Sequence, residues 1–87
     1  TSVCEYFKIK EDELMSKSRL KNILMPRQIA MFLSRELTNN SLHSIAVKFG
    51  GKDHTTVLYA CKKIKNLYNS DEYVKGVIDE IKKSVER

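Results

Sequence analysis

Two amphipathic segments joined by a pair of glycines constrain the fold of this chain more than any other feature of its sequence. Their apolar residues recur three and four positions apart, at Leu42, Ile45, Ala46 and Phe49 and then at Val57, Ala60, Cys61, Ile64, Leu67 and Tyr68. This spacing is typical of helices that bury one face. Gly50 and Gly51 separate the segments, and glycine takes the positive φ of a helix end without a steric penalty. The pattern therefore predicts a helix-turn-helix over about residues 41–69.

Helical periodicity continues through the rest of the chain, and no stretch alternates in the manner of a half-buried strand. Short helices are expected over residues 2–9 and 10–16. Pro26 suits the first turn of a further helix, because the N–H that proline lacks has no partner there. The stretch before it has no clean period, so a basic loop is predicted over about residues 17–25. A break at residues 69–70 precedes a final amphipathic helix.

The prediction is a single all-α domain over residues 1–87 with about six helices, since 41% hydrophobic residues suffice for one core. Ser41 and Asp53 are residues that often cap helix N-termini, and each precedes one helix of the predicted pair. The inward-facing residues expected in the other helices are Val3, Tyr6, Phe7, Ile29, Leu33, Leu37, Val74, Val77, Ile78, Ile81 and Val85.

Charge is distributed unevenly along the chain. Residues 15–65 contain ten basic and two acidic residues, a net charge of +8, whereas the two ends together contain six basic and nine acidic residues, a net charge of −3. This segregation indicates a surface for a polyanion on the middle of the chain. A solvated basic face is the alternative, and charge alone does not separate the two.

The two cysteines, Cys4 and Cys61, are predicted to be free thiols. Small domains that depend on disulfides usually contain four or more cysteines. Cys61 also lies on an apolar helical stripe, where a thiol behaves as a small hydrophobic group. A zinc site that combined these cysteines with His43 and His54 would need ligands paired at short spacing, and none are paired. No metal site is therefore expected.

The residues that open the second helix of the predicted pair offer the most chemistry. In a helix-turn-helix such residues enter the major groove of DNA, and those found here are Lys52, Asp53, His54, Thr55 and Thr56. Asp53 can accept a hydrogen bond from cytosine N4, whereas His54 and Thr55 suit base acceptors or a thymine methyl group. Thr56, one residue further into the helix, suits a phosphate.

Each of these residues also has a simpler interpretation. Asp53 can serve as an N-cap alone. His54 can be an exposed surface histidine without a role, and the two threonines can be ordinary first-turn residues. Both interpretations stand at this point.

Residues 41–64 resemble the signature of the DnaA family of bacterial replication initiators. The family pattern Ile-[Gly/Ala]-x-x-Phe-Gly-Gly-[Arg/Lys]-Asp-His-Thr-Thr-Val, followed by Ala-x-x-Lys-Ile, is matched by Ile45-Ala46, residues 49–57 and residues 60–64. Upstream, the segment MPRQIAMFLSRELTNNSL is similar to the family's Pro-Arg-Gln helix and its Glu-Leu-Thr-Asn ending. The resemblance covers most of residues 5–68.

The resemblance implies a helix-turn-helix domain that binds double-stranded DNA at DnaA boxes of the TTATCCACA type, at the origin of chromosome replication. The base contacts that it implies are by Asp53, His54 and Thr55 in the major groove and by Arg19, from the basic loop, in the minor groove. The phosphate contacts predicted with it are by Lys21, Arg27, Gln28, Arg35, Leu42, Lys52 and Thr56. Phosphate contacts position such a domain, and base contacts specify the site.

The chain departs from the family pattern at a few positions. Ser18, Leu20 and Asn22 dilute the basic loop, and His43 replaces a proline that is common after the leucine. Tyr59 stands where histidine is frequent. Lys52 replaces an arginine, which keeps the charge but loses the two-pronged hydrogen bonding of a guanidinium.

Other functions fit the sequence less well. An enzyme would need a nucleophile or a phosphate-binding loop, and adjacent residues such as Asp53 and His54 do not face each other on a helix. The charges of the last helix are too mixed for a membrane surface, and the major groove of RNA is too narrow for a helix. A different helix-turn-helix regulator would share the architecture.

No apolar run approaches the roughly 18 residues of a membrane span, and no signal-peptide pattern opens the chain. A cytoplasmic, nucleoid-associated protein without enzymatic activity is therefore expected. The resemblance places the family's ATP site in a separate domain, so no cofactor is expected in this chain. The partners it implies are DNA, the rest of the initiator protein and other initiator copies on origin DNA. The isolated domain is expected to be a monomer.

Overall fold

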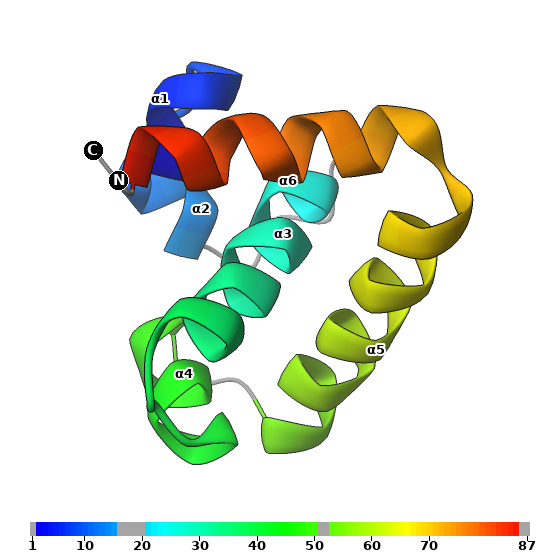
Figure 1. Ribbon diagram of the computed structural model, residues 1–87. Helices are drawn as coiled ribbons and strands as arrows, with labels where there is room; N and C mark the ends of the chain where they lie inside the picture. The colour runs from blue at the N-terminus through cyan, green and yellow to red at the C-terminus, as the bar shows by residue number, and fades with distance from the viewer. Residues whose placement is uncertain (1, 16–20, 51–52, 86–87) are drawn as a thin grey trace.

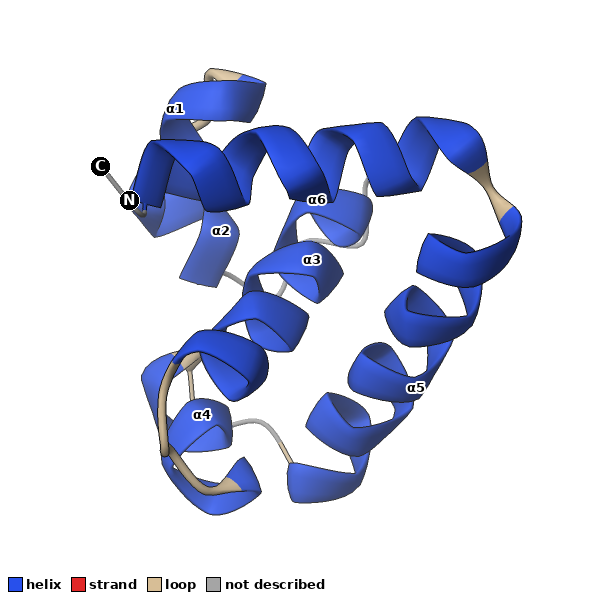
Figure 2. Cartoon of the chain, in the orientation of Figure 1, coloured by secondary structure: helices blue, strands red, loops and turns tan. Residues whose placement is uncertain are grey.

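The computed structural model describes residues 2–15, 21–50 and 53–85 (Figure 1). These residues form the helices α1 (Ser2–Phe7), α2 (Glu11–Met15), α3 (Lys21–Leu37), α4 (Leu42–Lys48), α5 (His54–Ser70) and α6 (Glu72–Val85). No strand occurs within the described ranges (Figure 2). The predicted all-α fold class with six helices is therefore confirmed.

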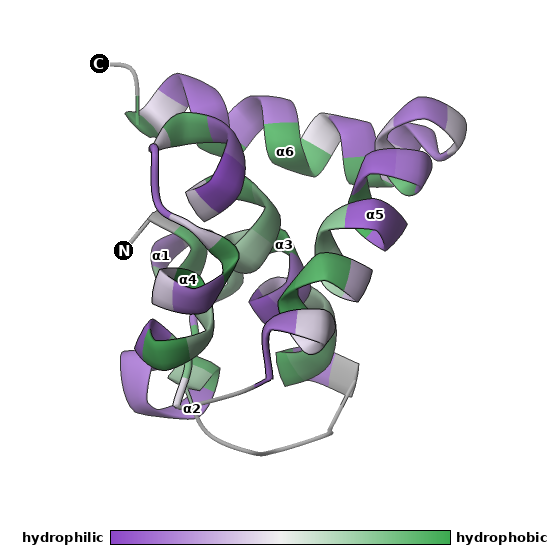
Figure 3. Cartoon of the chain, turned by 90° about the horizontal axis from the view of Figure 1, so that it is seen from below, coloured by the Kyte–Doolittle hydropathy of each residue, from purple (hydrophilic) through white to green (hydrophobic). Residues whose placement is uncertain are grey.

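The helix α3 lies at the centre of the fold and packs most extensively against α5. α4 and α6 also pack against α5, while α1 and α2 cover the side of α3 that faces away from it (Figure 1). The large side chains that are most deeply buried are Leu14, Ile23, Ile29, Met31, Ile45, Val57, Ile64, Ile78 and Ile81. Figure 3 shows the hydrophobic faces of α3, α5 and α6 turned towards one another. One core therefore joins the helices of the domain.

The helix α3 begins at Lys21, so the predicted loop boundary is wrong and Pro26 lies inside the helix rather than in its first turn. Proline has no N–H, and the carbonyl of Asn22 therefore lacks its usual helical partner. Tertiary packing favours the extra turn, because Ile23 is fully buried and Met25 packs against the core. The remainder of the predicted loop, residues 16–20, lies outside the described residues.

Polar caps fix the starts of two later helices. The Oγ of Ser41 accepts the N–H of Ser44 at 3.1 Å, which confirms Ser41 as the N-cap of α4. The Oδ1 of Asp71 accepts the N–H groups of Tyr73 at 2.9 Å and Val74 at 3.2 Å at the start of α6. These bonds satisfy backbone donors that have no partner within the helix.

Most residues that were predicted to face inwards do so, but three lie at the edge of the core. Tyr6, Leu37 and Val85 are exposed. Leu37 and Val85 are the last residues of α3 and α6. The rings of Tyr6 and Phe7 pack edge to face, with their centroids 5.1 Å apart.

Cys4 is buried and Cys61 is half-buried, and neither forms a disulfide in the described part of the chain. Among the described residues, no group of three His, Cys, Asp or Glu side chains is arranged to hold a metal ion. None of the helices in the described ranges combines the length and the apolar character needed to cross a membrane.

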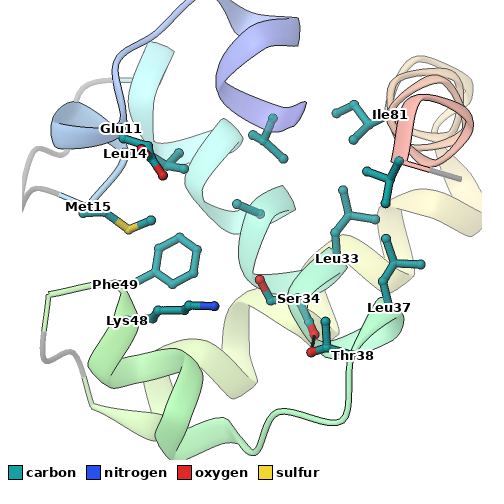
Figure 4. A pocket seen from close by; sticks show the side chains of 13 residues that line it. Glu11, Leu14, Met15, Leu33, Ser34, Leu37, Thr38, Lys48, Phe49 and Ile81 are labelled. Carbon is teal, nitrogen blue, oxygen red and sulfur yellow. Dashed lines mark hydrogen bonds between the residues drawn. The ribbon is translucent and has the colours of Figure 1, made fainter. Parts of the chain in front are cut away.

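An open apolar groove of about 390 Å³ lies between α1, α2, α3, α4 and α6 (Figure 4). Leu14, Leu33 and Phe49 line it, and the charged side chains of Glu11 and Lys48 lie beside them. In the described part of the chain, none of its lining residues belongs to α5. The groove is therefore separate from the helix that carries the predicted base contacts.

Candidate nucleic-acid interface

Gly50, which follows α4, lies close to the end of α2. Gly50 has a φ of 89° and donates its N–H to the carbonyl of Val47 at 3.2 Å. A Cβ at Gly50 would lie 2.8 Å from the carbonyl oxygen of Met15, closer than real Cβ atoms approach. Glycine is therefore required here for two reasons, its φ and the absence of a side chain. Sequence reasoning found the glycine but missed Met15, because only the tertiary contact reveals it.

The polar residues at the start of α5 form an outward-facing cluster. Asp53, His54, Thr55 and Thr56 are all exposed, and the side chain of Val57 that follows is fully buried. The change from exposed to buried therefore occurs at the residue where the apolar stripe begins. This cluster, residues 53–56, is called the recognition cluster below.

Asp53 caps α5, as one interpretation of the sequence predicted. Its Oδ1 accepts the N–H of Thr55 at 2.9 Å and the hydroxyl of Thr55 at 2.7 Å, and the Nδ1 of His54 lies 3.5 Å away. The backbone and hydroxyl hydrogen bonds from Thr55, and then the nearby His54, hold the pKa of Asp53 below its ordinary value. The carboxylate is therefore ionised at neutral pH. Within the described residues Oδ2 makes no hydrogen bond, so a cap and an outward-facing acceptor coexist on one side chain.

Arg35 and Leu42, two further predicted phosphate contacts, lie in α3 and α4. Arg35 is exposed in the last turn of α3, and its charge acts on the thiol of Cys61 in α5. Burial raises the pKa of Cys61, while Arg35 lowers it and Glu36 raises it. The guanidinium of Arg35 is thus accessible and near α5. Leu42 is half-buried and opens α4.

Arg27 and Gln28, predicted to contact phosphate, lie beneath the surface in this structure, 4% and 8% exposed. The Nε of Arg27 donates to the carbonyl of Leu14 at 2.9 Å, and burial lowers the pKa of the guanidinium. Both residues lie inside α3, in the part of the helix that the rest of the fold covers. Arg27 therefore ties α3 to the end of α2, while the phosphate contacts of both residues stay predictions.

Three further predicted contacts are only partly covered by the structure. Arg19 and Lys52 lie outside the described residues. Lys21 is the first residue of α3, but its side chain is not among those described. Of the predicted contacts, the structure thus places Asp53, His54, Thr55 and Thr56 together at the start of α5 and Arg35 near the same helix.

A bracing helix, a tight glycine turn and a second helix that begins with exposed polar residues define a helix-turn-helix domain of the DNA-binding class. The family model described as "Bacterial dnaA protein helix-turn-helix" matches residues 1–64. The chain belongs to this family, as the sequence resemblance indicated. It is also 49% identical over 84 residues to a curated protein from Lactobacillus johnsonii, the chromosomal replication initiator protein DnaA. The match covers 97% of this chain and 18% of that relative, so the chain spans less than a fifth of the relative's length.

Proposed function

We propose that this chain binds double-stranded DNA at DnaA-box sites of a bacterial replication origin, in the initiation of chromosome replication. The observation that supports this most directly is the outward exposure of the recognition cluster, immediately before the fully buried Val57. In this arrangement α4 braces α5, and the start of α5 enters the major groove. Family membership and the similarity to a replication initiator support the same function.

The recognition cluster supplies three kinds of contact with base edges. The Oδ2 of Asp53 accepts from cytosine N4 while Oδ1 keeps the cap. His54 donates to a base acceptor or packs against a thymine methyl group, and Thr55 offers its own methyl group to thymine. The pKa of Asp53, held low by Thr55, keeps the acceptor in its charged form at neutral pH.

Phosphate contacts hold the domain in register in this proposal. Thr56 and Arg35 are exposed on or near α5, and Leu42 opens α4. The remaining phosphate contacts, assigned on the family resemblance, are Lys21, Arg27, Gln28 and Lys52. Arg19 enters the minor groove on the same basis. Separately, the close approach of Gly50 to Met15 brings the end of α2 beside the end of α4.

The same proposal covers the wider setting of the domain. It has no catalytic activity and no cofactor of its own, because the family's ATP site belongs to another part of the initiator. Its partners are the rest of that protein and further copies on origin DNA, in the cytoplasm at the nucleoid. The isolated domain is a monomer.

Competition between a DnaA-box duplex and a scrambled duplex of the same length tests the proposal. We expect the box duplex to bind about a thousandfold more tightly at physiological salt, as specific sites usually do relative to non-specific DNA. The salt concentration must be the same in both arms. Equal affinity for the two duplexes would overturn origin recognition.

A further inference from the structure

The exposed face of α5 continues beyond the recognition cluster. Tyr59 lies one turn after Thr55 and is 62% exposed, and Lys62 follows three residues later and is also exposed. Residues four and seven positions apart share one face of a helix. Val57 and Ile64 lie on the opposite face and are fully buried. Thr55, Tyr59 and Lys62 therefore form one outward row, of which Tyr59 and Lys62 are called the α5 ridge.

The polar groups of the α5 ridge have no partner among the described residues. Tyr59 makes no hydrogen bond there, whereas the hydroxyl of Tyr68 donates to Asp79 at 2.6 Å. Lys62 forms no ion pair in the described part of the chain, whereas the Nζ of Lys75 lies 5.8 Å from the centre of the Tyr68 ring. The ridge thus presents a neutral donor and a cation to the solvent.

The charge of α5 suits a polyanion along this face. The helix contains Lys62, Lys63 and Lys65, and from His54 to Ser70 it contains no acidic residue. Its exposed row begins in the recognition cluster, so a ligand that covers the cluster extends naturally along it. A continuous phosphate backbone has the complementary charge and spacing.

We propose that Tyr59 and Lys62 bind phosphates at the wall of the major groove, an inference that rests on the proposed function. At 1.5 Å per residue, Tyr59 lies about 6 Å and Lys62 about 10.5 Å beyond Thr55 along the helix axis. The major groove is about 12 Å wide, so this part of α5 meets the groove edge when Thr55 reaches the bases. The tyrosine hydroxyl donates to one phosphate, and the ammonium group of Lys62 neutralises another.

Two substitutions separate the neutral donor from the charge. Tyr59→Phe removes only the hydroxyl, so we expect the Kd to rise about fivefold for both duplexes with the salt slope unchanged. Lys62→Gln removes a cation, so we expect weaker binding to both duplexes and a salt slope smaller by about one. Neither substitution changes the ratio of box to scrambled affinity, because phosphates carry no sequence information.

Matched controls come from α6. Tyr73 is 68% exposed and Lys83 is also exposed, so Tyr73→Phe and Lys83→Gln remove the same groups away from the ridge. We expect both controls to bind as the wild type does. Because all four side chains are exposed, the thermal unfolding midpoint should stay the same in every variant.

The outcomes distinguish this inference from the proposed function. If the wild type prefers the box duplex but the ridge variants bind like the α6 controls, the ridge assignment is wrong and the proposed function stands. If Tyr59→Phe alters only the ratio of the two affinities, Tyr59 reads a base and the phosphate contact is wrong. If the wild type binds the two duplexes equally, the proposed function fails. The affinities of the ridge variants for the scrambled duplex then still show whether Tyr59 and Lys62 contact phosphates.

Discussion

At the scale of single residues, Asp53 shows how one side chain serves structure and recognition together. Its Oδ1 accepts both hydrogen bonds from Thr55, and its exposed position leaves the rest of the carboxylate towards the solvent. The two interpretations that the sequence allowed, a cap and a base contact, are therefore compatible. The cap is confirmed, and the base contact stays a prediction.

Substitutions at Asp53 separate these two roles. Asparagine also caps helices well, so Asp53→Asn should unfold at nearly the wild-type temperature while preference for the correct base pair falls roughly tenfold or more. Asp53→Ala should lose both the cap and the preference. Thermal denaturation and binding to duplexes with single base-pair changes measure the two effects. Full base preference in Asp53→Asn would show that the charged acceptor is not used.

Arg27 and Arg35 should respond differently to the same change. Arg27→Ala removes a buried hydrogen bond to Leu14, so we expect the free energy of unfolding to fall by about 1–3 kcal/mol. Arg35 is exposed, so Arg35→Ala should leave stability unchanged and lower the salt slope of DNA binding by about one. Urea denaturation and salt titration supply the two measurements. Wild-type stability in Arg27→Ala would contradict the structural role of its guanidinium.

At the scale of helices, local signals in the sequence were sufficient for α4 and α5 but not for α3. Ser41, Asp53 and the glycine turn act on their immediate neighbours, so their positions predicted where those helices begin. The start of α3 depends on burial of Ile23, which requires the rest of the core. The phosphate contacts of Arg27 and Gln28 were expected from the family resemblance alone, and the burial of both residues likewise depends on tertiary packing. The exposure of the recognition cluster was predictable, because its residues come just before Val57, the first residue of the buried stripe of α5.

Two glycines in different elements should tolerate alanine very differently. Gly50 has positive φ and a Cβ there would meet Met15, so Gly50→Ala should destabilise the domain by at least about 1–2 kcal/mol. Gly76 lies within α6 with nothing within 4 Å of an added Cβ, so Gly76→Ala should stabilise it by about 0.5–1 kcal/mol. Chemical denaturation of both variants checks the pair. A stabilised Gly50→Ala would mean that the turn is not pressed against α2.

At the scale of the whole molecule, the arrangement of charge matters more than its total. Arg35 in α3 and Lys62 in α5 belong to the basic middle of the chain, and the charge of Arg35 acts on Cys61, the neighbour of Lys62. The lysines of α6 are instead interspersed with acidic residues. In the proposed complex, the duplex meets cations of α3 and α5, and α6 is not part of the proposed interface.

Paired double variants test whether this arrangement or the net charge governs binding. Arg35→Gln with Lys62→Gln, and Lys75→Gln with Lys83→Gln, each lower the formal net charge of +5 by two. We expect the first pair to reduce the salt slope by about two, because the two contacts are independent and each releases counterions. The second pair should leave the slope unchanged, since neither lysine of α6 belongs to the proposed interface. Equal slopes in the two double variants would mean that only the total charge attracts DNA, and the ordered interface across α3 and α5 would be wrong.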